Sequence, residues 1–289
     1  MSYSEILYAA DGPIGYLTLN NPSKINALSQ NMIAELSEAL NAIAADETVK
    51  VVVLRAAGKH FCAGHDLSEM VGCDMKAYRS IFEQCGRMMM SIRRLPQPVI
   101  AQVQGIATAA GCQLVAWCDL AVAEEGARFA TPGVKIGLFC STPMVALTRT
   151  IGRKAAMEML LTGRHVPAAE AQALGLVNRV VDGSRLAEET EALAATIAEA
   201  SPLALGIGKQ AFYEQIDMGD EKALAYGART IALNCLAEDA QTGIEAFLDR
   251  RTPEGKNRKP RRLPPREGGK GGLQGFPFSQ PNPGKCSIN

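Results

Sequence analysis

The amino-acid sequence predicts an α/β fold with a helical C-terminal region. Three observations indicate this fold: β-branched runs recur over the first 180 residues, glycine-containing loops follow two of these runs, and helical patterns alternate with them. Helical patterns dominate from about residue 153, and Pro, Gly, Lys and Arg dominate beyond residue 250. We therefore expect a core over 1–200, a helical region over 201–251 and a disordered tail over 252–289.

The expected elements follow from local patterns along the chain. Expected strands cover 14–20, 49–55, 99–103, 119–123, 128–130 and 177–181. Expected helices cover 29–45, 76–94, the segment from the 105–111 turn through Trp117, 154–161, 168–174 and 185–200, with further helices from 202 to 248. Ser29 is the expected N-cap of the first helix, because its hydroxyl can accept a hydrogen bond from a free backbone N–H.

Composition excludes several classes of partner. The 30 basic and 30 acidic residues cancel, so no global field attracts nucleic acid or an anionic membrane. No apolar stretch approaches the roughly 20 residues that span a bilayer. The eight cysteines form no Cys-x-x-Cys pair, and the three histidines lack metal-ligand spacing, so we expect no metal site. Free thiols and the lack of a recognisable targeting pattern at the start favour a cytoplasmic location.

Two loops carry the functional signal. Lys59–Leu67 and Gly105–Gln113 each follow a buried-type strand, and both are rich in small residues. Small residues let backbone amides approach a ligand closely, and a helix start can hold a developing negative charge. Each loop alone is typical of a packing turn, whereas two in equivalent positions favour a paired amide cradle. No Gly-x-Gly-x-x-Gly pattern supports a dinucleotide site.

With these motifs the chain resembles the enoyl-CoA hydratase/isomerase (crotonase) superfamily over roughly residues 5–251. Matching segments are Leu19–Pro22, Asn26–Leu28, Val51–Leu54, Phe61–Leu67, Pro98–Ala101, Gly105–Asp119, Phe129–Pro132, Met157–Gly163, Ala171–Val177 and Phe247–Arg251. More narrowly, Ala107–Ala116, Phe129–Val134 and Gly137–Pro143 resemble the branch of enoyl-CoA hydratase domain-containing protein 3.

The resemblance implies a crotonase-like spiral of ββα turns with a C-terminal helical trimerisation region, and hence a homotrimer or a dimer of trimers. It also implies an acyl-CoA thioester as ligand, with coenzyme A as part of the substrate and no separate cofactor. Carried onto this chain, the oxyanion hole consists of the backbone amides of His65 and Ala110. The implied ligand contacts are Ala63, His65, Asp66, Ala110, Gly111, Ser141, Phe247 and Arg250, the last two from a neighbouring subunit.

The two acid/base positions depart from the family pattern. Family hydratases use two glutamates, and the corresponding positions here are Gln113 and Gly133. An amide neither gains nor loses a proton near neutral pH, and glycine has no side chain. We therefore expect acyl-CoA binding without the usual hydration. Two alternatives stay open: an enzyme with altered or weak hydratase/isomerase (lyase-type) chemistry, and a non-catalytic acyl-CoA-binding or regulatory protein.

Other side chains near these positions have competing interpretations. Cys140 lies beside Ser141 and Thr142 in a family loop that faces the acyl group, where a thiol could be a nucleophile, but no activating group is evident and packing is favoured. His65 is expected to be an exposed loop histidine, with contact to CoA as plausible as catalysis. For Asp66, helix capping is favoured.

Overall fold

Six strands form the main sheet of the computed structural model, which describes residues 3–251. The strand order is β1 (Ile6–Asp11), β2 (Ile14–Leu19), β3 (Val51–Ala56), β4 (Val99–Val103), β6 (Leu120–Glu124) and β9 (Arg179–Val181). Only β1 and β2 pair antiparallel, and the other neighbours are parallel. Parallel strands are buried on both faces, which explains the continuous β-branched run of β3.

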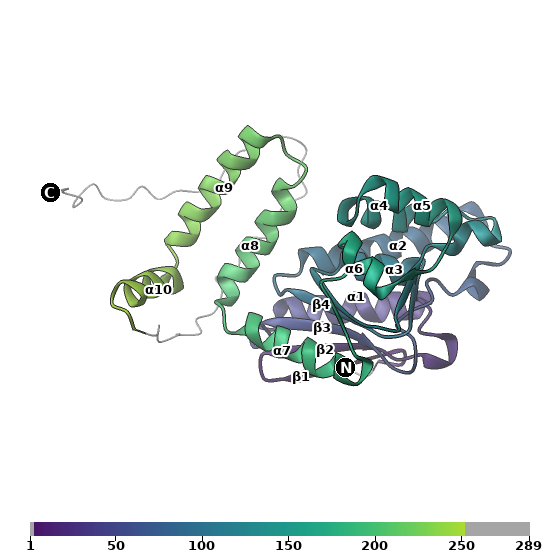
Figure 1. Ribbon diagram of the computed structural model, residues 1–289, viewed down its shortest axis with the longest axis horizontal. Helices are drawn as coiled ribbons and strands as arrows, with labels where there is room; N and C mark the ends of the chain where they lie inside the picture. Colours follow the sequence, from purple (N-terminus) through teal and green to yellow (C-terminus); the bar gives the residue numbers. More distant parts are fainter. Residues whose placement is uncertain (1–2, 252–289) are drawn as a thin grey trace. The chain divides into compact units, whose positions relative to one another are not determined.

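Helices cover both faces of this sheet (Figure 1). On one face, α1 (Gln30–Ala45), α2 (Met75–Arg94) and α3 (Ala110–Trp117) share a large apolar core with the strands. On the other face, α7 (Leu186–Ala198) packs over Val51, Val53 and neighbouring strand residues. The Ser29 hydroxyl accepts a hydrogen bond from the Met32 N–H at 2.9 Å, which confirms the predicted N-cap of α1.

A second, three-stranded sheet forms where the chain leaves the main sheet. It joins β5 (Ile106–Thr108), β7 (Arg128–Ala130) and β8 (Val166–Pro167). Around it lie α4 (Ser141–Thr150), α5 (Arg153–Thr162) and α6 (Ala168–Leu174), and short 3-10 turns cover Pro22–Lys24, Leu67–Met70, Pro132–Ile136 and Gly183–Arg185. The small sheet holds the start of α3 against the loop that follows β3.

Three helices complete the described chain: α8 (Pro202–Gln215), α9 (Asp220–Cys235) and α10 (Glu238–Leu248). Large apolar side chains stay exposed on them, including Leu224, Ile231 and Phe247. Such surfaces mark interaction sites, so the predicted role in trimer formation remains an expectation for this region. The predicted tail over 252–289 lies outside the described residues.

The cluster that joins α8 to the core is ionic. The Lys209 ammonium lies 2.6 Å from an Asp119 carboxylate oxygen and donates to the carbonyls of Ile92 and Gln97. The other Asp119 oxygen accepts a hydrogen bond from the Tyr213 hydroxyl at 2.8 Å. This cluster places α8 against the ends of α2 and α3.

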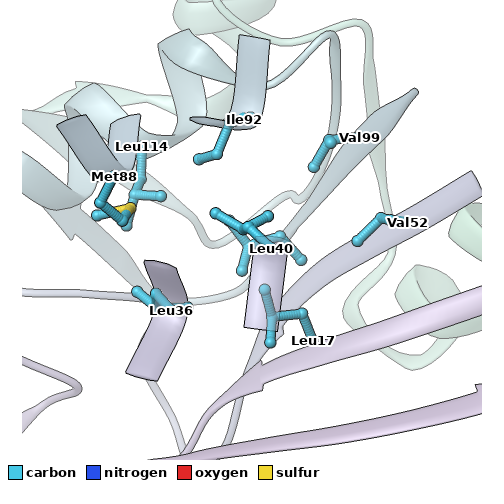
Figure 2. Close-up of a pocket in the computed structure, with 9 residues that line it drawn as sticks. Leu17, Leu36, Leu40, Val52, Met88, Ile92, Val99 and Leu114 are labelled. Carbon is cyan, nitrogen blue, oxygen red and sulfur yellow. The ribbon is translucent and has the colours of Figure 1, made fainter. Parts of the chain in front are cut away.

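A small void lies inside the main core, between the sheet and helices α1, α2 and α3 (Figure 2). Its volume is about 10 Å³, room for at most one water molecule. It is lined only by Leu17, Leu36, Leu40, Val52, Leu54, Met88, Ile92, Val99 and Leu114. A space this small and apolar is a packing gap rather than a ligand site. Separately, no helix within residues 3–251 has the length and apolar character to cross a membrane.

Most expected elements are present with boundaries shifted by a few residues, but four were missed. They are β1, β5, β8 and α4. In β1 only Ile6 is buried, so this edge strand lacks a clear alternating pattern. The structure also corrects the expectation that Ser141 and Thr142 lie in a loop, because α4 begins at Ser141.

Candidate functional site

The first loop, Lys59–Asp66, leaves the carboxyl end of β3 and is held by the segment before α1. The Leu28 N–H donates to the Gly64 carbonyl at 2.7 Å, and the Asp66 N–H donates to the Leu28 carbonyl at 3.2 Å. His65 lies between these two bonds in a bridge with Leu28. Its own N–H has no partner among the hydrogen bonds of residues 3–251.

The second loop leaves the carboxyl end of β4, the neighbour of β3 in the sheet. Cys62 and Ala107 form a bridge, and the Thr108 N–H donates to the Cys62 carbonyl at 2.9 Å. The Thr108 hydroxyl also donates to the Ala63 carbonyl at 2.9 Å. Adjacent parallel strands thus bring the two predicted loops together at one edge of the sheet, where open α/β folds bind ligands.

Close packing of the loops depends on glycine. Gly64 has φ of +100°, and a Cβ there would lie 2.9 Å from the Ala109 Cβ and 3.3 Å from the Ala110 nitrogen. A Cβ on Gly111 would lie 2.3 Å from the Cys62 carbonyl oxygen. Side chains at either position would force the loops apart.

Backbone strain marks the start of α3. Ala109 adopts φ of 49° and ψ of −118°, a region that residues with a Cβ avoid. Its N–H donates to the Ala130 carbonyl at 2.9 Å, which holds the conformation. Ala110 then begins α3, and in the part of the chain that the structure describes its N–H has no partner. An anionic oxygen beside the Ala110 and His65 N–H groups would satisfy both.

The His65 side chain corrects a prediction. Its ring packs edge-on against Phe82 with centroids 5.2 Å apart, and its Nε2 is buried without a hydrogen-bond partner. His65 is therefore a packed residue rather than the expected exposed one. Burial lowers the pKa of His65 to about 4, so the imidazole is neutral at physiological pH.

Gln113 and Gly133 are both buried. Gln113 is 5% exposed, and its Oε1 has no hydrogen-bond partner. At Gly133, a Cβ would lie 2.6 Å from the Leu138 carbonyl oxygen and 2.9 Å from the Cys140 Sγ. The turn before α4 therefore occupies the space that a side chain at position 133 would need.

Cys140 supports packing rather than nucleophilic chemistry. Its side chain is buried, and burial raises the pKa of its thiol, which disfavours the reactive thiolate. Burial likewise raises the pKa of Cys62 and of Cys112 to about 12. All cysteines within residues 3–251 are free, so no disulfide constrains this part of the chain.

Of the remaining predicted ligand contacts, Asp66 has partners within the chain, whereas Ser141, Phe247 and Arg250 are exposed. The Asp66 carboxylate accepts a hydrogen bond from the Ser68 N–H and so caps the Leu67–Met70 turn, as predicted. It also forms an ion pair with Lys24 at 2.7 Å. Ser141 is exposed at the start of α4. Phe247 and Arg250 are exposed at the end of α10, so their contact with a ligand bound to another subunit stays a prediction.

Sequence reasoning did not single out Thr131, which the structure shows as an unpaired polar residue next to the small sheet. Thr131 is fully buried, and its Oγ1 has no hydrogen-bond partner. Its signal was its place in the Phe129–Pro132 motif, two residues before the position of a family glutamate. A surface hollow of about 250 Å³ also borders the first loop, lined by Pro22, Ile25, Asn26, Ala57, Gly58, Lys59 and His60.

The parallel sheet, the small second sheet and the paired loops define the crotonase class of α/β fold, as predicted. Residues 10–258 match the family model described as enoyl-CoA hydratase/isomerase. The chain therefore belongs to the enoyl-CoA hydratase/isomerase family.

Individual relatives agree with the narrower resemblance. The zebrafish (Danio rerio) enoyl-CoA hydratase domain-containing protein 3, mitochondrial, is 45% identical over 89% of this chain and 89% of its own length. The structure of human enoyl-CoA hydratase domain-containing protein 3 superposes with a TM-score of 0.85 at 42% identity, covering 86% of this chain and 99% of the other. An enoyl-CoA hydratase structure from Mycobacterium smegmatis gives 0.86 at 51% identity, covering 87% and 98%.

The predicted cytoplasmic location was wrong. Five vertebrate relatives, 42–45% identical, are named as mitochondrial proteins. The prediction depended on free cysteines and on the absence of a recognisable targeting pattern. Free thiols persist in any reducing compartment, and an absent pattern at the printed start does not define a location.

Proposed function

We propose that the protein binds an acyl-CoA thioester, with the thioester oxygen between the backbone N–H groups of His65 and Ala110. The observation that carries this proposal is the pair of unpaired N–H groups on two loops in direct contact. Such donors are fixed before the ligand arrives, so they stabilise negative charge on the oxygen without reorganisation. The hollow beside Lys59 offers space and a cation for the nucleotide end of coenzyme A.

Calorimetry with the full chain tests this binding. We expect butyryl-CoA to bind about tenfold or more tightly than S-butyl-CoA, a thioether that lacks the carbonyl oxygen, because two hydrogen bonds are lost. The two ligands otherwise share the nucleotide, the pantetheine arm and the alkyl length. Equal affinities would show that the two N–H groups do not hold the thioester oxygen, and absence of binding to either ligand would refute the proposal.

We also propose that hydration is weak, because Gln113 and Gly133 cannot move protons. Each positioned acid/base group contributes roughly 10²–10⁴ to the rate, so hydration of crotonyl-CoA should be lower than that of a family hydratase by at least about 10². Gln113→Glu is expected to raise the rate. Adding Gly133→Glu should give no further gain, because its Cβ would lie 2.6 Å from the Leu138 carbonyl oxygen.

The rates are measured by loss of the enoyl absorbance, with Gln113→Met as the matched variant that supplies no carboxylate. Wild-type hydration at the usual family rate would contradict the argument from Gln113 and Gly133. Exchange of α-hydrogens with D₂O separates the two open alternatives: exchange indicates residual enolate chemistry, whereas bound acyl-CoA without exchange or turnover favours the non-catalytic protein.

A further inference from the structure

The Thr108 hydroxyl joins the two amide-bearing loops at a point close to both proposed oxyanion donors. It donates a hydrogen bond to the Ala63 carbonyl at 2.9 Å, and Thr108 is only 7% exposed. Ala63 lies two residues before His65, and Thr108 lies two residues before Ala110. One buried hydrogen bond thus connects the two chain segments at the same sequence distance from each of the two N–H groups.

Backbone hydrogen bonds between the two loops end one residue earlier. The Thr108 N–H donates to the Cys62 carbonyl at 2.9 Å. In the described part of the chain, no backbone hydrogen bond joins residues 63–65 to residues 109–111. The Thr108 side chain therefore supplies the last direct hydrogen bond between the loops before the segments that carry the two N–H groups.

The other bonds of the first loop hold it against the segment before α1. The Ala63 N–H donates to the Ile25 carbonyl at 3.0 Å, and the Gly64 carbonyl accepts from the Leu28 N–H at 2.7 Å. The C=O and N–H of a trans peptide point to opposite sides, so the Leu28 bond directs the His65 N–H away from Leu28. These bonds set the direction of the His65 donor, but they do not set its distance from the second loop.

We propose that Thr108 is a positioning residue, whose hydroxyl fixes the spacing of the His65 and Ala110 N–H groups and so lets the site distinguish a thioester from a ligand without a carbonyl oxygen. Gly64 lies between Ala63 and His65 with φ of +100°. Glycine has many other conformations available, because it lacks a Cβ. Without the Thr108 bond, the Ala63–Gly64 peptide is free to turn and to shift the N–H that follows it. This inference rests on the proposed acyl-CoA binding.

A purely structural role for the hydroxyl predicts a different result. Thr190 is also buried, and its hydroxyl donates to the Leu186 carbonyl within α7 at 2.7 Å. Loss of such a bond lowers stability, whereas loss of the spacing lowers the preference for a ligand with a thioester oxygen. The ratio of two affinities separates these roles, because general damage to the protein weakens the binding of both ligands.

Calorimetry with butyryl-CoA and S-butyl-CoA on the full chain tests the inference. We expect the wild-type protein to bind the thioester about tenfold or more tightly than the thioether. Thr108→Val keeps the β-branched shape without the hydroxyl and should reduce this ratio to about threefold or less, because only one of the two N–H groups then reaches the oxygen. Thr108→Ser retains a donor and should keep the wild-type ratio. Thr190→Val, the matched loss of a buried hydroxyl, should keep it as well.

The outcomes separate this inference from the proposed function. A wild-type ratio in Thr108→Val, or an equal fall in Thr190→Val, would overturn the positioning role and leave acyl-CoA binding intact. Loss of the preference in Thr108→Ser would also overturn it, because the hydroxyl would then not be the cause. Chemical unfolding shows which variants are folded, and Thr108→Ala, which lacks the hydroxyl and adds no bulk, replaces Thr108→Val if valine prevents folding. A wild-type ratio near one, or no binding of either ligand, would refute the proposed function itself.

Discussion

Replacing Lys209 with methionine is expected to lower the free energy of unfolding by about 3–5 kcal/mol. The Lys209 side chain is 5% exposed and the Asp119 side chain 15% exposed, with their charged atoms 2.6 Å apart. Methionine fills a similar volume but leaves the Asp119 carboxylate without its cation. The remaining bonds from Tyr213 and the Val99 N–H offset only part of this loss.

Chemical unfolding followed by circular dichroism measures the effect, with Arg79→Met as the matched control. Arg79 also forms an ion pair, with Glu83 at 2.6 Å, but the two side chains are 75% and 50% exposed. Exposed ion pairs contribute little, so we expect a much smaller change. Similar losses in both variants would contradict the argument from burial. In a double-mutant cycle, Lys209→Met with Asp119→Leu should cost less than the sum of the single changes.

Burial also lowers the pKa of Lys209, despite the opposing effect of Asp119. Hydrogen bonds to the carbonyls of Ile92 and Gln97 complete its surroundings. The cluster therefore joins α8 to the segments at the ends of α2 and α3, and loss of its cation should loosen this junction.

Local patterns predicted the strands and loops of the site, because their causes are local. The β-branched run of β3 and the small residues from Ala107 to Gly111 are each visible within a few positions. Parallel strand ends meet at one edge of a sheet, so two such loops were expected to lie together. The close approach of Gly111 to Cys62 shows that the two loops do lie together.

The features that sequence reasoning missed depend on distant partners. Lys209 lies within a helical pattern, and nothing near it in the sequence indicates that its ammonium pairs with Asp119, which is distant along the chain. Nothing in the sequence distinguishes Thr131 from other threonines. Only the structure shows that it is buried and that its hydroxyl has no hydrogen-bond partner within the described residues. His65 was expected to be exposed because loops usually are, but packing against Phe82 of α2 leaves the residue only partly exposed.

The second large effect is expected from Gly111→Ala, which should weaken butyryl-CoA binding by about tenfold or more. The new Cβ would lie 2.3 Å from the Cys62 carbonyl oxygen and 2.8 Å from the Cys62 Cβ. Cys62 cannot yield easily, because its carbonyl accepts from the Thr108 N–H and its own N–H donates to the Ile106 carbonyl. The start of α3 must move instead, which separates the Ala110 N–H from the His65 N–H. The expected loss is that of the hydrogen bonds which these two groups donate to the thioester oxygen.

Gly86→Ala in α2 is the matched control, because no atom lies within 4 Å of the added Cβ. Alanine is favoured over glycine inside a helix, so this control should be slightly more stable and bind butyryl-CoA as the wild type does. Calorimetry gives the affinities, and chemical unfolding shows whether Gly111→Ala retains a folded core. A folded Gly111→Ala protein with unchanged affinity would mean that the spacing of the two amides does not determine thioester binding. Loss of binding in that folded variant alone would assign this spacing a direct role, because Gly111 does not line the surface hollow formed by Pro22, Ile25, Asn26 and residues 57–60.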